Sequence, residues 1–292
     1  MRKAQIYILP AGKTTVQRLE LLFFQGEPLE MLDAYQHFPS VLGNRVEGTS
    51  SSGARKLAVF GNCPGDIYDW SGIRTYTSLQ ERTFSLSDED PAEPMLVGTA
   101  DLPEGSRRTC QVILHPMLSR ISLHSIGCDF SQRPYAGQRL QNVRAYLTYA
   151  CDACRPLDPD YQPVSWINAG GLDEAETAAL AHPEMVFAEV SPSLGGRIYP
   201  DLDFYCYPNP SDGETFGQPV TRLVIEGTLL GTTYYYPIDL PGLEAAVHYQ
   251  LDITLTRTGT RSADVPAEDA PLFLECRILD WDGRQWDDIH YQ

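Results

Sequence analysis

The sequence predicts an all-β protein built of two tandem β-sandwiches, with short helices confined to loops. At 292 residues the chain is long for a single sandwich. Its 16 Tyr and 10 Phe are residue types that strands favour. Its 22 Pro and 23 Gly indicate frequent turns, so the strands are expected to be short. We place the first sandwich at residues 1–117 and the second at residues 118–292.

The first expected strands are separated by a polar segment. Residues Ala4–Leu9 form the first of them. Residues Leu19–Phe24 are too apolar for a strand with one exposed face, which is typical of a central strand. The polar residues 43–55 predict a loop, and Lys56–Phe60 predicts a buried strand after it.

Proline positions and a helix cap predict the rest of the first half. Ser71 is a suitable N-cap for a short helix over residues 71–80. The prolines within residues 91–103 predict an edge strand or an extended crossing segment. Residues Cys110–Leu114 are expected to form a strand, and the break at His115-Pro116 is taken as the domain boundary.

The second half is also predicted to consist mainly of short strands. Residues Ile121–Ile126 alternate apolar and polar, as a half-buried strand does. Residues 173–181 carry the clearest helix signal, and Asp282-Gly283 suits the turn of a terminal hairpin. We expect Trp281 to be buried in the second core. The remaining strands are expected at Leu140–Leu147, Phe204–Tyr207, Thr221–Thr228, Tyr234–Ile238, Tyr249–Thr256, Leu274–Trp281 and Arg284–Ile289.

The charge of the chain excludes several classes of partner. The 39 acidic and 22 basic residues give a net charge of −17. Such a chain repels phosphate backbones and anionic headgroups, so nucleic acid is not an expected partner. No apolar run approaches the length of a transmembrane segment. The first residues are typical of a strand rather than of the apolar core of an export signal, so we expect no such signal in this sequence.

The cysteine spacing does not predict a disulfide framework. The number of cysteines is odd and their spacing is irregular. Cys151 and Cys154 are the one close pair, which is compatible with a redox motif or half a zinc site, but no second pair completes either. We expect all the thiols to be unbridged and free of metal: Cys63, Cys110, Cys128, Cys151, Cys154, Cys206 and Cys276.

Motifs for catalysis are missing from the sequence. Residues Gly48–Gly53 contain the letters of a nucleophile elbow at the wrong spacing, and the six His are scattered singly. The acidic residues around Asp280 and Asp282 lack the spacing of a calcium loop, and a hairpin turn explains them better. We therefore expect no enzyme activity and no cofactor.

Several stretches of the sequence share the pattern of one family of surface proteins. In the first half an apolar strand ends on an Asn, over Ala54–Asn62, and a basic and apolar crossover strand follows later, over Leu114–Leu123. The other stretches are Met95–Gly98, Leu140–Leu147, Thr221–Gly227, Tyr234–Ile238, His248–Gly259 and Leu274–Trp281. On these residues the chain resembles the fimbrillin superfamily of type V pili from Bacteroides and Porphyromonas relatives, which includes shaft, anchor and tip subunits.

This resemblance implies a fold, a location and partners. The fold would be two transthyretin-like Greek-key β-sandwiches without catalytic function. The chain would act in adhesion at the cell surface, in a fimbria associated with the outer membrane, after export as a lipoprotein. Its partners would be other fimbrial subunits, joined by β-strand donation, and also host or bacterial surface ligands or glycans.

The resemblance also implies which residues take part in assembly. In shaft subunits of the family, an Arg- or Lys-directed protease removes the first strand and opens a groove. The corresponding strand here is Ala4, Gln5, Ile6, Tyr7, Ile8 and Leu9, and the loop after it carries Lys13 and Arg18. Because this loop is short for a processed shaft subunit, an unprocessed anchor or tip role is favoured slightly over a shaft role.

The sequence leaves a second class of function open, that of a carbohydrate-binding surface lipoprotein. Aromatic side chains exposed on a sandwich can stack on sugar rings. A strand with one face in the core explains the tyrosine run better. The candidates are Tyr205, Tyr207, Tyr234, Tyr235, Tyr236 and Trp286.

Overall fold

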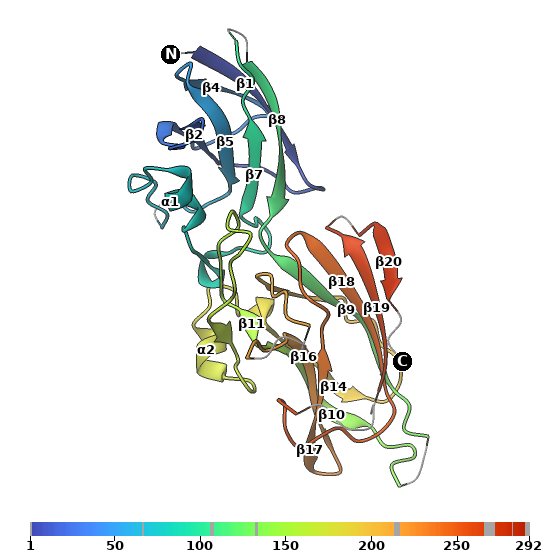
Figure 1. The fold of residues 1–292 in the computed structure, drawn as a ribbon. Helices are drawn as coiled ribbons and strands as arrows, with labels where there is room; N and C mark the ends of the chain where they lie inside the picture. The colour runs from blue at the N-terminus through green and yellow to red at the C-terminus, as the bar shows by residue number, and fades with distance from the viewer. Residues whose placement is uncertain are drawn as a thin grey trace. The chain divides into compact units, whose positions relative to one another are not determined.

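The computed structural model forms two compact units, each rich in strands. It describes residues 2–65, 67–105, 108–131, 134–212, 217–265, 272–281 and 283–289. The first unit comprises Met1–Met117 together with Cys154–Tyr161, and the second comprises Leu118–Ala153 and Gln162–Gln292. The prediction of a nearly all-β chain is confirmed, since strands far outnumber the short helices among the described residues (Figure 1).

The first unit is built around one folded sheet. Its strand order is β3-β2-β5-β7-β8-β1-β4. Neighbours pair antiparallel except β1 and β8, which are parallel. The strands are β1 (Arg2–Pro10), β2 (Leu19–Gln25), β3 (Leu32–Phe38), β4 (Arg45–Ser50), β5 (Ala54–Gly61), β7 (Leu96–Asp101) and β8 (Arg108–Pro116).

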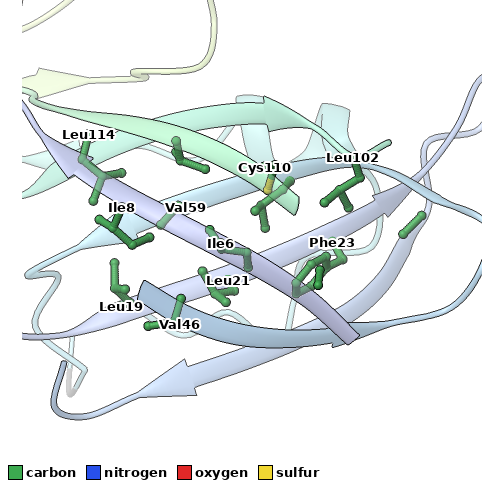
Figure 2. Close-up of a cluster of buried hydrophobic side chains, with 14 of the residues drawn as sticks. Ile6, Ile8, Leu19, Leu21, Phe23, Val46, Val59, Leu102, Cys110 and Leu114 are labelled. Carbon is green, nitrogen blue, oxygen red and sulfur yellow. The ribbon is translucent and has the colours of Figure 1, made fainter. Parts of the chain in front are cut away.

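The two halves of this sheet enclose a single core. β7 pairs with β8 only at Leu96 and Val97, so the sheet divides there into β3-β2-β5-β7 and β8-β1-β4. Buried side chains from both halves form one hydrophobic cluster, which Figure 2 shows around Leu21, Val46 and Val59. Because both halves contribute to one core, the unit is stabilised by packing between them as well as by strand pairing.

The second unit contains two larger sheets. One has the order β14-β10-β16-β17, from β10 (Leu140–Thr148), β14 (Phe187–Leu194), β16 (Arg222–Leu229) and β17 (Thr232–Asp239). The other has the order β15-β9-β18-β19-β20, from β9 (Ser119–Cys128), β15 (Leu202–Cys206), β18 (Val247–Leu255), β19 (Leu272–Asp280) and β20 (Gln285–Ile289). Of the minor strands, β6 (Phe84–Ser85) belongs to the first unit, β11 (Ala150–Cys151) and β13 (Trp166–Ile167) belong to the second, and β12 (Ala153–Cys154) spans the boundary in the chain.

Both predicted helices exist, and both are shorter than expected. Helix α1 (Tyr76–Gln80) begins five residues after Ser71, because Thr75 and Ser78 form the capping box at its start. Ser71 instead bonds the Asp69 carboxylate. Helix α2 (Glu174–Ala178) lies within the predicted range and is capped by Asp173. Two 3₁₀ turns span Leu86–Asp88 and Pro183–Met185.

The prediction of a loop over residues 43–55 was wrong, because β4 lies within it. The inward positions of β4 are Val46, Gly48 and Ser50, and only Val46 carries an apolar side chain. The hydrophobic pattern that identifies a strand is therefore weak here. The segment is also polar because β4 lies at the edge of the sheet, with one side unpaired by any other described strand. On β4 the backbone amide of Thr49 donates to the Gln36 side chain at 2.8 Å.

Two further expectations need correction. Trp281 follows the end of β19 and is only partly buried, whereas Cys276 and Leu279 are the buried residues of that strand. Its place beyond the last paired residue, Asp280, explains its exposure. Strand β7 is not at an edge, since it lies between β5 and β8; its pairing with β8 at two residues fits the alternative of a crossing segment.

Gly48 offers a direct test of the packing against β4. A Cβ atom at Gly48 would lie 2.5 Å from Cζ of Phe23, so the core would have to shift. We expect Gly48→Ala to lower the free energy of unfolding by about 1–3 kcal/mol in denaturant titrations. Gly53→Ala is the control, because its Cβ would meet no atom closer than 3.5 Å. Equal unfolding midpoints for the two variants would contradict the placement of β4.

Candidate strand-exchange site

Strand β1 occupies an interior position in the sheet of the first unit. It pairs antiparallel with β4 and parallel with β8, so that Ile6 lies between Val46 and Cys110. Figure 1 shows this strand, in dark blue, beside both neighbours. Because β1 is hydrogen-bonded along both sides, its removal would leave backbone donors and acceptors of β4 and β8 without partners.

The inward face of β1 belongs to the core. Ala4, Ile6 and Ile8 are buried, with exposed fractions of 0%, 0% and 1%. Figure 2 shows Ile6 and Ile8 directed into the cluster that contains Leu21. Burial of one isoleucine side chain stabilises a fold by roughly 1.5–3 kcal/mol. Removal of β1 would therefore expose an apolar groove.

The cysteine beside this groove reports on whether the groove is filled. Cys110 of β8 is buried in the same cluster and lies in register with Ile6. Burial raises the pKa of the Cys110 thiol from 9.0 to about 11. A thiol with this pKa is almost fully protonated at pH 8, so Cys110 is expected to react slowly while β1 is in place.

A buried arginine lies at one end of the groove. Arg108 is 2% exposed and in register with Ala4 across the β1–β8 pair. Its guanidinium donates to the Ser50 hydroxyl at 3.2 Å and to the Ser52 carbonyl at 2.8 Å. Its Nε atom has no hydrogen-bond partner among the described residues. This end of the groove therefore carries the positive charge of Arg108, whose N–H groups are only partly hydrogen-bonded.

Asn62 holds the second half of the loop that follows β1. It is 2% exposed and has a left-handed backbone conformation with φ of 59°. Its side chain donates to the Thr15 carbonyl at 2.9 Å and accepts from the Gln17 backbone amide at 2.9 Å. The backbone amide of Asn62 donates to the Arg18 carbonyl at 3.1 Å. The Arg18 guanidinium donates to the backbone carbonyl of Asn62 at 3.3 Å.

The two predicted processing residues therefore differ in their surroundings. Arg18 is partly buried and bound to Asn62 through its backbone and its side chain. Lys13 is exposed and lies in the turn directly after β1, next to Gly12 with φ of 76°. Proteases bind their substrates in extended, accessible form, so Lys13 is the better site of the two. The sequence alone did not distinguish them.

The aromatic residues proposed to bind sugars do not form one surface. Tyr207 and Tyr236 are fully buried, and the hydroxyl of Tyr236 donates to the Arg257 carbonyl at 3.0 Å, so neither can stack on a ligand. Tyr234 and Tyr235 are partly exposed on β17, whereas Tyr205 belongs to the other large sheet. The side chain of Trp286 lies outside the described residues.

The seven cysteines are free thiols, and all but Cys128 are buried. Burial raises the pKa of Cys206 and of Cys276 to about 12, which makes them unreactive near neutral pH. The described residues contain no group of three or more His, Cys, Asp and Glu placed to hold a metal ion. No helix in the described part of the chain has the length and apolar character needed to cross a membrane.

Solved structures share this fold. A proposed cell adhesion protein from Bacteroides eggerthii has a TM-score of 0.75 at 18% identity, over 96% of each chain. A fimbrilin from Porphyromonas gingivalis has a TM-score of 0.71 at 15% identity, over 98% of this chain and 99% of its own. The tip fimbrial protein of the same organism has a TM-score of 0.56 at 12% identity, over 96% of this chain and 100% of its own.

These comparisons establish the fold. No protein-family model matches the sequence, and no curated protein matches it. The structural neighbours are fimbrilins and proposed cell adhesion proteins of Bacteroides, Parabacteroides and Porphyromonas. The resemblance found in the sequence is therefore confirmed at the level of the fold.

The role of Asn62 can be tested by removing its side chain while keeping its backbone conformation. Glycine tolerates the left-handed region, so Asn62→Gly removes the bonds to Thr15, Gln17 and Pro94 without backbone strain. We expect trypsin cleavage after Arg18 to become at least about tenfold faster. Asn142→Gly in the second unit, also at positive φ, is the matched control. Unchanged cleavage after Arg18 would show that Asn62 does not protect the loop.

Proposed function

We propose that this chain is a non-catalytic subunit of a cell-surface fimbria and that it joins a neighbour through the position of β1. The single observation that carries the proposal is that β1 fills an interior position of the sheet with Ala4, Ile6 and Ile8 buried in the core, directly before an exposed turn that contains Lys13. The shared fold with a fimbrilin over nearly the whole of both chains supports it. Export as a lipoprotein and a place at the outer membrane are part of this proposal.

The physical basis of the proposal is strand addition. A groove left by β1 would present the unpaired edges of β4 and β8 and the apolar pocket that held Ile6 and Ile8. A strand donated by another subunit would satisfy both, because main-chain bonds supply affinity and alternate side chains fill the pocket. The same contacts that complete the single chain would then join two subunits.

The shape and charge of the groove specify the strand that it would accept. Alternate inward positions now hold Ala4, Ile6 and Ile8. Ala4 lies between Gly48 and Arg108, so this end admits a small residue, while the next two positions admit β-branched residues. The position two residues before the small one lies on the same face of the strand, and β1 carries Arg2 there; an acidic residue at that position would pair with Arg108.

Whether β1 leaves depends on access to Lys13. The sequence contains three lysines, and Lys3 and Lys56 lie within strands, so a Lys-specific protease has one exposed turn to attack. A shaft subunit is expected to be cleaved there and to assemble. An anchor or tip subunit is expected to keep β1, to resist cleavage and to stay monomeric.

The proposal predicts that cleavage after Lys13 exposes Cys110. Once β1 can leave, the pKa of Cys110 falls from about 11 toward 9.0, which raises the thiolate fraction at pH 8 about a hundredfold. We expect alkylation of Cys110, followed by peptide mass analysis, to accelerate at least tenfold after treatment with a Lys-specific protease. Cys276, in the second unit, should not change.

Matched controls separate the outcomes of this experiment. Lys13→Gln should abolish both cleavage and the gain in Cys110 reactivity. Size-exclusion chromatography of the cleaved chain then reports the subunit type, since growth into multimers identifies a shaft subunit. Cleavage that leaves Cys110 protected and the chain monomeric would contradict strand exchange at this position.

A further inference from the structure

The outer face of the five-stranded sheet in the second unit is polar. The inward residues of β9 and β18, such as Ile121 and Leu251, are buried in the core. The residues between them face the other way and form rows across the strands. One row is Tyr205, Arg120, His248 and Leu279, and the next is Asp203, Ser122, Gln250 and Arg277.

Four of these residues form a connected network. The Ser122 hydroxyl bonds Nε2 of His248 at 2.6 Å and donates to the Asp203 carboxylate. The other oxygen of Asp203 accepts from the Arg120 guanidinium at 2.7 Å. Nδ1 of His248 and Nε of Arg120 have no hydrogen-bond partner among the described residues. The network therefore holds its side chains in place and retains polar atoms that are not satisfied.

This network does not have the arrangement of a hydrolase triad. In a triad the histidine lies between the carboxylate and the serine, whereas here Asp203 contacts Ser122 and not Nδ1 of His248. Burial, together with the charge of Arg120, lowers the pKa of His248 to about 4, so it is a weak base. Ser122 is only 7% exposed. The geometry fits binding better than catalysis.

A cavity opens beside the network. Its volume is about 350 Å³, which lies within the range of small-molecule sites. The side chains that line it include donors and acceptors placed side by side. They are Arg120, Ser122, His124, Asp201, Asp203 and Gln250, together with His248.

Aromatic residues lie next to residues that line this cavity, since Tyr205 is in register with Arg120 and Tyr199 contacts His124. The rings of Tyr205 and Trp281 lie 6.2 Å apart, although their strands are separated in the sheet by β9 and β18. The two side chains therefore extend toward each other across the sheet. The ring of Tyr199, which is 62% exposed, packs edge-on against the His124 ring, with 5.6 Å between the ring centroids.

We propose that this cavity binds a neutral saccharide. A sugar presents hydroxyl groups that donate and accept at once, which suits a guanidinium and carboxylates held side by side. Its apolar ring face suits the partly exposed rings of Trp281 and Tyr205. Asp201 and Asp203 outnumber Arg120, so an anionic sugar would be repelled. This site is independent of strand exchange, because all its residues belong to the second unit.

The test uses the full chain with free sugars as probes. Saturation-transfer NMR is recorded with glucose, galactose, mannose and N-acetylglucosamine, and with N-acetylneuraminic acid as the anionic comparison. We expect at least one neutral sugar to bind with a Kd of about 1 mM, as is reasonable for a ligand of this size. The anionic sugar should not bind.

Variants locate the binding. Trp281→Ala removes a partly exposed ring and should weaken binding about tenfold, and Asp203→Asn should do the same through the polar network. Tyr234→Ala, on β17 of the other sheet, is the matched aromatic control and should bind as the parent does. Binding of no neutral sugar, preference for N-acetylneuraminic acid, or binding unchanged in both Trp281→Ala and Asp203→Asn would overturn the proposal.

Discussion

The first unit depends on the strand that fills the position between β4 and β8. Among the described residues β4 pairs with no strand other than β1, so its backbone pairing in the sheet depends on β1. Ile6 and Ile8 also complete the core from the same strand. The core, the edge strand β4 and the protection of Cys110 therefore depend on one segment, which a short loop joins to β2. A strand that is both essential and locally attached is suited to exchange between subunits.

The sequence predicted those strands whose inward residues are large and apolar. Leu19–Phe24 and Tyr249–Thr256 were placed correctly as β2 and β18 for this reason. β4 was missed because Gly48 and Ser50 occupy inward positions. The ring of Phe23 leaves no room for a side chain at Gly48. Trp281 was wrongly assigned to the core, since an aromatic residue in a turn cannot be told from a strand residue by periodicity alone.

The two candidate sites differ in how far a sequence can reveal them. The exchangeable strand was predicted from a family resemblance, but the anchoring of the following loop by Asn62 depends on bonds between residues more than 40 positions apart. The polar cavity gave no signal in the sequence, because Ser122 and His248 are 126 positions apart and meet only through the parallel register of β9 and β18. In this account the first unit joins subunits and the second presents a ligand site.

Native mass spectrometry shows whether the β1 position accepts a strand from outside the chain. The chain cleaved after Lys13 is incubated with an isotopically labelled peptide of residues 1–10, and a peptide carrying Ile6→Asp serves as the control. We expect the labelled peptide to replace residues 1–13 in a one-to-one complex. The control peptide should not, because a carboxylate cannot enter the apolar position of Ile6. Retention of the original strand without any uptake, or equal uptake of both peptides, would contradict strand exchange at β1.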